Sequence, residues 1–253
     1  MNLSRASFCI LFTLSLAACT FTGQQDISPL PVDFASRPTN GKTIALLGAT
    51  GMVGDFVMRE ALHQGYAVRV LARSPEKLNA VKDHITIVKG DARDIAALRI
   101  VLTGSDAIIS ALGPVKADGN AAHGLSTLVT GHIVRLMSEL NINRYIVVSG
   151  AAVNIPTDHR NLMGWLIETL AKLAYWNVAQ DKQAEYELLA ESSANWTLLR
   201  CPVIDREPFR NNAIATLDTP HAFNVRAGEV AQFIIEQIDS SEFVRKGPFL
   251  GSE

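Results

Sequence analysis

The chain has 253 residues, 48% of them hydrophobic, and a formal net charge of −2 at pH 7. This length and composition fit one compact domain with a single core, and the near-neutral charge gives no electrostatic reason to expect a nucleic-acid partner. Of the three cysteines, two lie close to the N-terminus, which excludes a disulfide framework and a cysteine-based metal site; Cys201 is expected to be a small buried apolar residue.

The first element that the sequence predicts is an N-terminal targeting signal. The apolar run over residues 6–18 is too short to span a bilayer and has the build of a secretory signal. It ends in LAAC at positions 16–19, which resembles the bacterial lipoprotein box. That resemblance implies that residues 1–19 are a lipoprotein signal with a lipidated Cys19. Because Thr20 follows, it favours a periplasm-facing protein of the outer membrane in a bacterial cell envelope. An uncleaved apolar anchor and a misassigned start codon are the alternatives.

Residues 20–41 show neither helical nor strand periodicity and contain three prolines among scattered polar residues. This composition predicts a flexible tether between the lipid and the domain, with an arm packed on the domain surface as the alternative. The folded domain is therefore expected over residues 42–253.

Within that domain, continuous apolar runs alternate with segments in which apolar residues have helical spacing, as is typical of buried strands and the helices between them. Predicted strands cover 43–49, 67–72, 85–90, 106–112, 144–151, 196–202 and 247–251. Predicted helices cover 52–64, 94–104, 124–141, 165–193 (as one helix or two) and 227–238, and a loop-rich stretch runs from 203 to about 225. This order predicts an α/β fold with a doubly wound, mostly parallel sheet of Rossmann type in a single domain. In such a sheet, ligands bind at the carboxyl ends of the strands.

Three glycines, Gly48, Gly51 and Gly54, stand between the first predicted strand and the first predicted helix. A backbone without side chains can approach a pyrophosphate closely, and a helix N-terminus offers unpaired N–H groups and a partial positive charge. The spacing differs from the Gly-x-Gly-x-x-Gly of many dehydrogenases, so a tight turn without a ligand stays open. The predicted phosphate-binding segment also includes Thr50, Met52 and Val53.

The end of the second predicted strand discriminates between NAD and NADP. An acidic residue there would bind the ribose 2′-hydroxyl of NAD, but this chain has Arg73 with no acid before it. A guanidinium suits a 2′-phosphate, and Ser74 and Lys77 are placed to assist. We therefore predict that NADP(H) is preferred over NAD(H); a solvated surface arginine is the alternative.

These motifs together resemble the atypical short-chain dehydrogenase/reductase superfamily, and within it the single-domain NAD(P)H-binding, NmrA-like and flavin-reductase-like proteins. The matches follow in order: GATGMVG at 48–54, VRVLARSPEKL at 68–78, VKGDARD at 88–94, DAIISALG at 106–113, YIVVSGA at 145–151, NWTLLRCPVI at 195–204 and VRAGEVAQFIIEQI at 225–238. The resemblance implies that Asp91 contacts adenine and that Ser149 holds the active-site serine position. It also implies that the segment beside the cofactor is Ser110, Ala111, Leu112 and Gly113.

The chain departs from that family at the catalytic acid. Hydride-transferring members commonly carry Tyr-x-x-x-Lys, in which the lysine lowers the tyrosine pKa so that the phenol can exchange a proton near neutral pH. Lys182 falls at the lysine position, but the tyrosine position holds Val178, and Tyr175 is two helical turns before Lys182 and too far away for the same role. No general acid is therefore assigned. Lys182 is either a catalytic-site residue that holds the cofactor ribose or a solvated helix lysine.

Reduction of flavins and quinones suits a site without a side-chain acid, because hydride passes between stacked rings and water can supply the proton. The favoured function is an NADPH-dependent reductase of flavins, quinones or similar flat acceptors. Ser149 would bond the nicotinamide or the acceptor, unless it is a strand-end serine bonded to backbone. The alternative is a non-catalytic NAD(P)H-binding sensor or interaction module in the envelope, and an epimerase or isomerase ranks third. The expected partners are a small molecule and, through the lipid, the membrane, for a monomer or weak homo-oligomer.

The remaining side chains that could carry chemistry give weaker indications. His159, in the loop after the fifth predicted strand, is either a ligand of the acceptor or solvent-exposed. The other histidines form no metal-ligand pattern, and no metal site is predicted. Trp165, Tyr175 and Trp176 are predicted to line the core or a pocket, with a membrane-facing side as the alternative.

Overall fold

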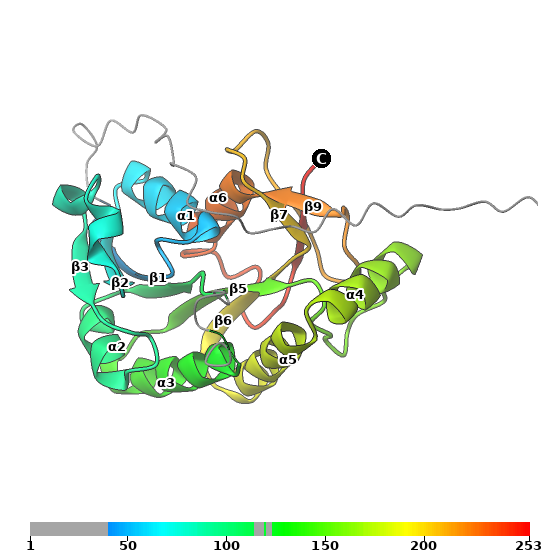
Figure 1. Cartoon of the computed structure of the whole chain (residues 1–253), viewed down its shortest axis with the longest axis horizontal. Helices are drawn as coiled ribbons and strands as arrows, with labels where there is room; N and C mark the ends of the chain where they lie inside the picture. Colours follow the sequence, from blue (N-terminus) through cyan, green and yellow to red (C-terminus); the bar gives the residue numbers. More distant parts are fainter. Residues whose placement is uncertain (1–39, 114–118, 120–122) are drawn as a thin grey trace, which may run out of the picture. The chain divides into compact units, whose positions relative to one another are not determined.

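Eight strands of the described residues form one sheet, in the order β3-β2-β1-β4-β5-β6-β10-β8 (Figure 1). The computed structural model describes residues 40–113, 119 and 123–253, so Cys19, the predicted signal and most of the predicted tether lie outside them. The strands are β1 (Thr43–Leu47), β2 (Ala67–Ala72), β3 (Thr86–Lys89), β4 (Ala107–Ser110), β5 (Arg144–Gly150), β6 (Asn195–Cys201), β8 (Ile214–Thr216) and β10 (Phe249–Gly251).

Neighbouring strands run parallel from β3 to β10, and β8 joins β10 in antiparallel fashion. Two further strands, β7 (Val203–Asp205) and β9 (Asn224–Arg226), pair in parallel as a separate small sheet. The predicted α/β fold, a doubly wound, mostly parallel sheet of Rossmann type in a single domain, is therefore confirmed. The antiparallel edge strand is an addition to it.

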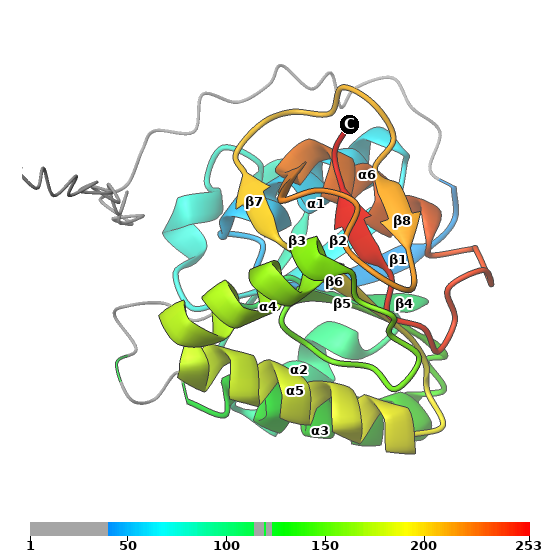
Figure 2. The same ribbon diagram turned by 90° about the vertical axis from the view of Figure 1, so that its right-hand side faces the viewer.

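Helices cover both faces of the large sheet. α1 (Met52–His63) and α6 (Ala227–Glu236) pack on one face, and α2 (Ile95–Leu102), α3 (Leu125–Leu140) and α5 (Trp176–Glu191) pack on the other (Figure 1). α4 (Leu162–Ala174) lies on the outside of these layers, alongside α5 (Figure 2). Two short 3-10 helices, η1 (Pro75–Leu78) and η2 (Lys82–His84), connect β2 to β3. A search of the described helices finds none long and apolar enough to cross a bilayer.

The side chains of each central strand alternate between two cores, as the pleat of a strand requires. On β1, Ile44 and Leu46 belong to the core beneath α1 and α6, whereas Ala45 and Leu47 belong to the core beneath α2, α3 and α5. All four side chains are fully buried. Because both faces of the strand are covered, it appears in the sequence as an unbroken apolar run.

Arg200 of β6 fastens β10 into the sheet. Its guanidinium carbon lies 3.6 Å from the centre of the Phe249 ring, and its Nε donates to the carbonyl oxygen of Gly247 at 2.7 Å. One terminal nitrogen pairs with Oδ2 of Asp158 at 2.6 Å. Burial lowers the pKa of Arg200 to about 10, and the Asp158 carboxylate opposes that shift. The arginine of the NWTLLRCPVI segment therefore has a structural role.

The structure resolves one open alternative and corrects one prediction. The helical segment predicted over 165–193 is two helices, divided at Tyr175, whose backbone angles (φ −137°, ψ 46°) leave the helical region. The stretch from 203 to about 225, predicted to be loop, contains β7, β8 and β9. Each of these strands has three residues, which is too short to show a period of two.

Candidate functional site

The candidate site lies where the order of the strands reverses. β1 pairs with β2 on one side and with β4 on the other, so the connections that follow β1 and β4 leave the sheet in opposite directions and a crevice opens between them. Leu47 is in register with Ser110, and the segments that begin at Gly48 and Ala111 therefore leave the sheet side by side.

The glycine loop after β1 packs closely against the segment that follows β4. Gly48 has a φ of +83°, and a Cβ atom there would lie 2.6 Å from the carbonyl oxygen of Ala111. The Gly51 N–H donates to the Gly48 carbonyl oxygen at 2.9 Å, and a Cβ atom on Gly54 would overlap that same oxygen. The first two glycines therefore shape a backbone cradle, and the third lets α1 pack directly on it.

The N-terminus of α1 opens onto this cradle. Gly51 is the N-cap in an extended conformation (φ −85°, ψ 170°), and no side chain caps the helix. The first-turn N–H groups of Met52, Val53 and Gly54 are therefore of the kind that bind an anion. Asp55, an acidic residue in the first turn, directs its carboxylate to Arg59 at 3.1 Å. The cradle and the helix end together fit a dinucleotide pyrophosphate.

The predicted residues for the adenosine half of the cofactor follow the next two strands at the same edge of the sheet. Arg73 comes directly after β2 and is exposed, and the half-buried Ser74 is the N-cap of η1, which also carries the exposed Lys77. Asp91 follows β3 and is half-buried. Its Oδ1 accepts from the Arg93 N–H and its Oδ2 from the Arg93 guanidinium, both at 2.9 Å.

The segment after β4, which the resemblance places beside the cofactor, lies against the glycine loop. The Ala111 N–H donates to the carbonyl oxygen of Leu47 at 3.0 Å, which continues the ladder past the end of β4. Ser110 is buried, Ala111 and Leu112 are half-buried, and Gly113 is exposed. The structure thus brings this segment and the glycine loop together.

Ser149 lies near the carboxyl end of β5, the strand next to β4. Its side chain is buried, and its Oγ has no hydrogen-bond partner among the residues that the structure describes. A buried hydroxyl without a partner is costly, which marks a site that a ligand or water completes. The alternative that this serine bonds the backbone at the strand end is therefore wrong.

Lys182 of α5 reaches the same strand end. Its Nζ donates to the carbonyl oxygen of Val148 at 3.1 Å and to Oε2 of Glu185 at 2.8 Å. Lys182 is only 6% exposed and Glu185 only 1%, so the alternative of a solvated helix lysine is wrong. The Lys182 ammonium group lies next to the backbone of Ser149, but it is already paired with the buried carboxylate of Glu185.

The Glu185 carboxylate belongs to a buried series of hydrogen-bonded side chains. Oε1 of Glu185 accepts from the Thr130 hydroxyl at 2.8 Å, and Thr130 Oγ1 lies 3.0 Å from the phenolic oxygen of Tyr145. Burial, reinforced by the charge of Glu185, raises the pKa of Tyr145 well above its ordinary value. Tyr145 therefore stays protonated and holds Glu185 in place through Thr130. The Lys-x-x-Glu spacing was a signal for this pair, but the sequence analysis missed it.

No tyrosine replaces the one missing at Val178. Tyr145 is committed to this buried series, Tyr186 packs edge-on against Trp196, and Tyr175 is exposed at the break between α4 and α5. The fourth, Tyr66, precedes β2 and lies at the opposite edge of the sheet. The described side chains therefore supply no phenol positioned beside Lys182.

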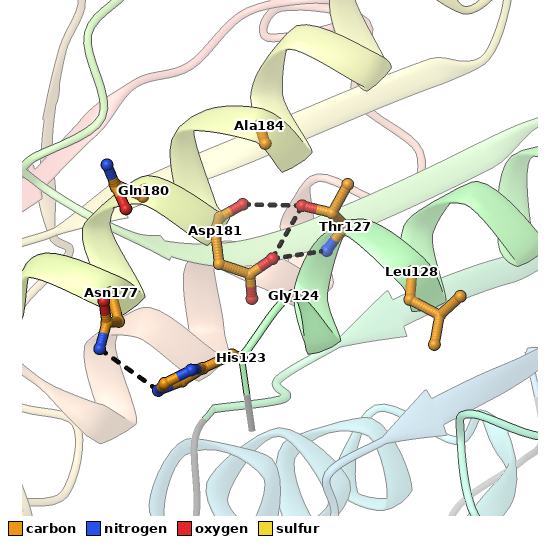
Figure 3. Close-up of a pocket in the computed structure, with 8 residues that line it drawn as sticks. All are labelled: His123, Gly124, Thr127, Leu128, Asn177, Gln180, Asp181 and Ala184. Carbon is orange, nitrogen blue, oxygen red and sulfur yellow. Dashed lines mark hydrogen bonds between the residues drawn. The ribbon is translucent and has the colours of Figure 1, made fainter. Parts of the chain in front are cut away.

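A separate open pocket of about 580 Å³ lies between the start of α3 and α5 (Figure 3). It is lined by His123, Gly124, Thr127, Leu128, Asn177, Gln180, Asp181 and Ala184. Oδ1 of Asp181 accepts from the Thr127 N–H at 3.0 Å and from its hydroxyl at 2.7 Å, and Oδ2 accepts from the Ser126 N–H at 2.8 Å. Since this carboxylate caps α3, the pocket offers no open helix end to an anion, and none of the predicted site residues lines it.

The structure decides the expectations for several other residues. His159 is exposed, and its N–H donates to the carbonyl oxygen of Asp218 at 3.1 Å. Cys201 is buried as expected, and burial raises its thiol pKa to about 12. Trp165, Tyr175 and Trp176 were predicted to line the core or a pocket. The core prediction is wrong, because all three are more than half exposed, and none of them lines the pocket between α3 and α5.

Comparison with known proteins shows which family the chain matches. A sequence profile described as NAD(P)H-binding matches residues 48–241, which begins at the first glycine of the loop. Cinnamoyl-CoA reductase 1 of Arabidopsis thaliana is 23% identical over 188 residues, covering 63% of this chain and 54% of that protein. The chain spans about half or less of the length of such curated relatives.

Two solved structures show the same fold. ChuY, an anaerobillin reductase from Escherichia coli O157:H7, superposes with a TM-score of 0.69 and 19% identity over 82% of this chain and 96% of that one. A short-chain dehydrogenase/reductase from Veillonella parvula, solved in complex with NADP, superposes with a TM-score of 0.67 and 19% identity over 83% of this chain and 94% of that one.

Proposed function

The chain belongs to the NAD(P)H-binding family of atypical short-chain dehydrogenases/reductases, and within that family we propose that it is an NADPH-dependent reductase of a flavin, a quinone or a similar flat acceptor. The observation that carries this proposal is the Ser149 hydroxyl. It is buried and without a partner among the described residues, at the edge of the sheet where the glycine loop opens.

The cofactor would be held by residues from three connections, those that follow β1, β2 and β3. The loop Gly48–Gly54 would bind the pyrophosphate through backbone N–H groups, Arg73 with Ser74 would bind the 2′-phosphate, and Asp91 would contact adenine. When bound, a reduced nicotinamide supplies the hydride. The NADP complex of the Veillonella parvula protein, which shares this fold, is consistent with this assignment.

Ser149 and water would carry out the remaining steps, which are orientation of the acceptor and its protonation. The Ser149 Oγ can donate to a carbonyl oxygen of the acceptor or of the nicotinamide amide and so orient the two rings. No described tyrosine stands beside Lys182 as a proton donor, so solvent would protonate the reduced acceptor. Flat conjugated acceptors suit this arrangement because their reduction requires stacking and exclusion of side reactions rather than a side-chain acid. The reductase activity of ChuY supports this class of reaction.

The position of Lys182 favours a second candidate, a non-catalytic NAD(P)H-binding sensor. Its Nζ is bonded to Glu185 and to the Val148 carbonyl oxygen, so it would have to give up a partner to bind ribose. A protein with this arrangement can bind the dinucleotide through the loop and transfer no hydride.

Titration with NADPH and NADH, followed by turnover with FMN and with a soluble quinone, separates the two candidates. The reductase predicts saturable NADPH binding and NADPH oxidation that Ser149→Ala lowers at least about tenfold, the value of one or more lost hydrogen bonds. Binding without turnover on either acceptor would support the sensor. Absence of binding would mean that the glycine loop is only a structural turn.

We also propose that the protein is anchored in the bacterial envelope through a lipid on Cys19, facing the periplasm from the outer membrane. The LAAC motif and Thr20 support this location. Replacement of Cys19 by Ser should release the protein from the membrane fraction and change the size of the mature form. Unchanged fractionation and size would contradict lipidation.

A further inference from the structure

Helix α4 turns an apolar side to solvent. Seven large side chains between residues 162 and 176 are each at least 40% exposed, and Leu162 and Leu173 are 81% and 79% exposed. We call this set the α4 face: Leu162, Trp165, Leu166, Leu170, Leu173, Tyr175 and Trp176. At 3.6 residues per turn, the five members on α4 itself fall within about 140° of its circumference, so they form one continuous stripe.

The opposite side of the helix is already used for packing. Ile167 is buried in a small core with Ala151 and Phe249, and a Cβ atom on Gly164 would touch the Thr219 side chain at 2.7 Å. The α4 face is therefore not a packing surface of the domain, and α4 lies at its outside (Figure 2).

The α4 face carries no charge. The two charged residues of α4, Glu168 and Lys172, lie on its flank and pair with each other at 2.5 Å. Glu168 also accepts from the Asn154 side chain at 2.8 Å. Thr169, within the stripe, donates its hydroxyl to the Trp165 carbonyl oxygen at 2.8 Å and is satisfied. The surface thus offers leucine side chains between aromatic rings and almost no directional polar group.

We propose that the α4 face lies in the surface of a lipid bilayer. Tryptophan and tyrosine favour the interface between headgroups and acyl chains, and Trp165 stands near one end of the stripe while Tyr175 and Trp176 stand at the other. An apolar helix face of this kind inserts by about 5–10 Å without crossing the membrane. A protein partner would need about one hydrogen bond per 100–200 Å² of interface, which this surface does not supply.

The sequence supplies an independent argument for a lipid surface. The proposed lipid on Cys19 would be joined to the domain by residues 20–41, which reach about 75–80 Å at most when extended. A tether of that length holds the domain at a high effective concentration near the bilayer, so a weak apolar contact suffices for docking. Docking goes beyond the proposed reduction and requires no bound nucleotide; it relies on lipidation only for this concentration effect.

Tryptophan fluorescence provides a direct test, because the chain has three tryptophans and two of them lie on the α4 face. The third, Trp196, is only 3% exposed. The full chain is reconstituted in phosphatidylcholine vesicles, with or without bromine on the acyl chains. Insertion by about 5–10 Å predicts at least about threefold stronger quenching of Trp165 and Trp176 than of Trp196. Trp165→Phe and Trp176→Phe, singly and together, assign the signals.

Matched variants then locate the contact. The double variant Leu162→Gln/Leu173→Gln should lose the quenching. Ile100→Gln, which changes an apolar residue of α2 that is 58% exposed, should keep it. High salt should leave the quenching unchanged, since the face is uncharged. Equal emission from brominated and plain vesicles overturns the proposal, and so does a dimer in sedimentation that the leucine double variant abolishes. Fractionation of Cys19→Ser tests the anchor separately.

Discussion

Glu185 lies one turn after Lys182 on α5, and its Oε2 is 2.8 Å from the lysine Nζ, with both side chains buried. The pair joins the end of β5 to the Thr130–Tyr145 hydrogen bond, so one ammonium group connects the candidate site to the core between α3 and α5.

The first prediction concerns this pair. Glu185→Gln leaves the buried Lys182 without its countercharge, and we expect the free energy of unfolding in urea to fall by about 3–5 kcal/mol. Arg135→Ala removes an exposed partner of Glu139 and should cost no more than about 1 kcal/mol. The double variant Lys182→Met/Glu185→Leu should recover most of the loss. Equal effects of Glu185→Gln and Arg135→Ala would show that water reaches the pair.

The second prediction compares two glycines with nearly the same φ angle. Gly48 and Gly104 have φ values of +83° and +77°, but only at Gly48 would a Cβ atom meet another atom, the Ala111 oxygen. Gly104→Ala should lower stability by about 1–2 kcal/mol, the cost of the left-handed conformation, and leave NADPH affinity unchanged. Gly48→Ala should cost more and abolish binding. NADPH affinity that survives Gly48→Ala would place the cofactor elsewhere.

The third prediction concerns the choice of cofactor. Arg73→Ala should weaken NADPH binding at least about tenfold, because a charge-assisted hydrogen bond contributes about 1.5–3 kcal/mol. NADH binding should change less than about twofold, since NADH lacks the 2′-phosphate. Arg210→Ala, which removes an exposed positive charge near Glu207, is the matched control. Parallel losses for both nucleotides would sink the assignment of Arg73.

The fourth prediction follows from the pKa of Cys201. Burial raises it from 9.0 to about 12, so the folded protein keeps the thiol neutral where the unfolded chain would ionise it. The free energy of unfolding is therefore unaffected by this thiol below about pH 9, and it falls as the pH rises toward 12 and the unfolded chain ionises. In a Cys9→Ser/Cys19→Ser background, a thiol reagent at pH 8 should react with the urea-unfolded chain and leave the native protein unmodified. Rapid native-state labelling would mean that the β6 end opens readily.

Much of the architecture could be predicted from local patterns. The predicted strand over 67–72 coincides with β2, and the predicted helix over 52–64 with α1, because each pattern records which faces the rest of the domain covers. The glycine loop could also be predicted, because a side chain at Gly48 or Gly54 would collide with backbone atoms that are close in the chain or in the sheet.

Features that depend on contacts between residues far apart in the chain could not be predicted from the sequence. The carboxylate that pairs with Lys182 is held by Thr130 from α3, which in turn contacts Tyr145 from β5, and neither residue is near Lys182 in the chain. The prediction for Trp165 was wrong for a different reason. Apolar spacing locates a stripe on a helix, but it cannot say which side of that helix the domain covers, and on α4 part of the stripe faces outward.

The place of β10 in the sheet has a consequence for how the protein is made. Residues 249–251 are inserted between β6 and β8, and Arg200 needs Gly247 and Phe249 for its contacts. Because a nascent chain emerges from the ribosome N-terminal end first, β6 keeps an unpaired edge until these late residues have been translated. Until then the sheet is incomplete, and Arg200 lacks both its hydrogen bond to Gly247 and its contact with the Phe249 ring.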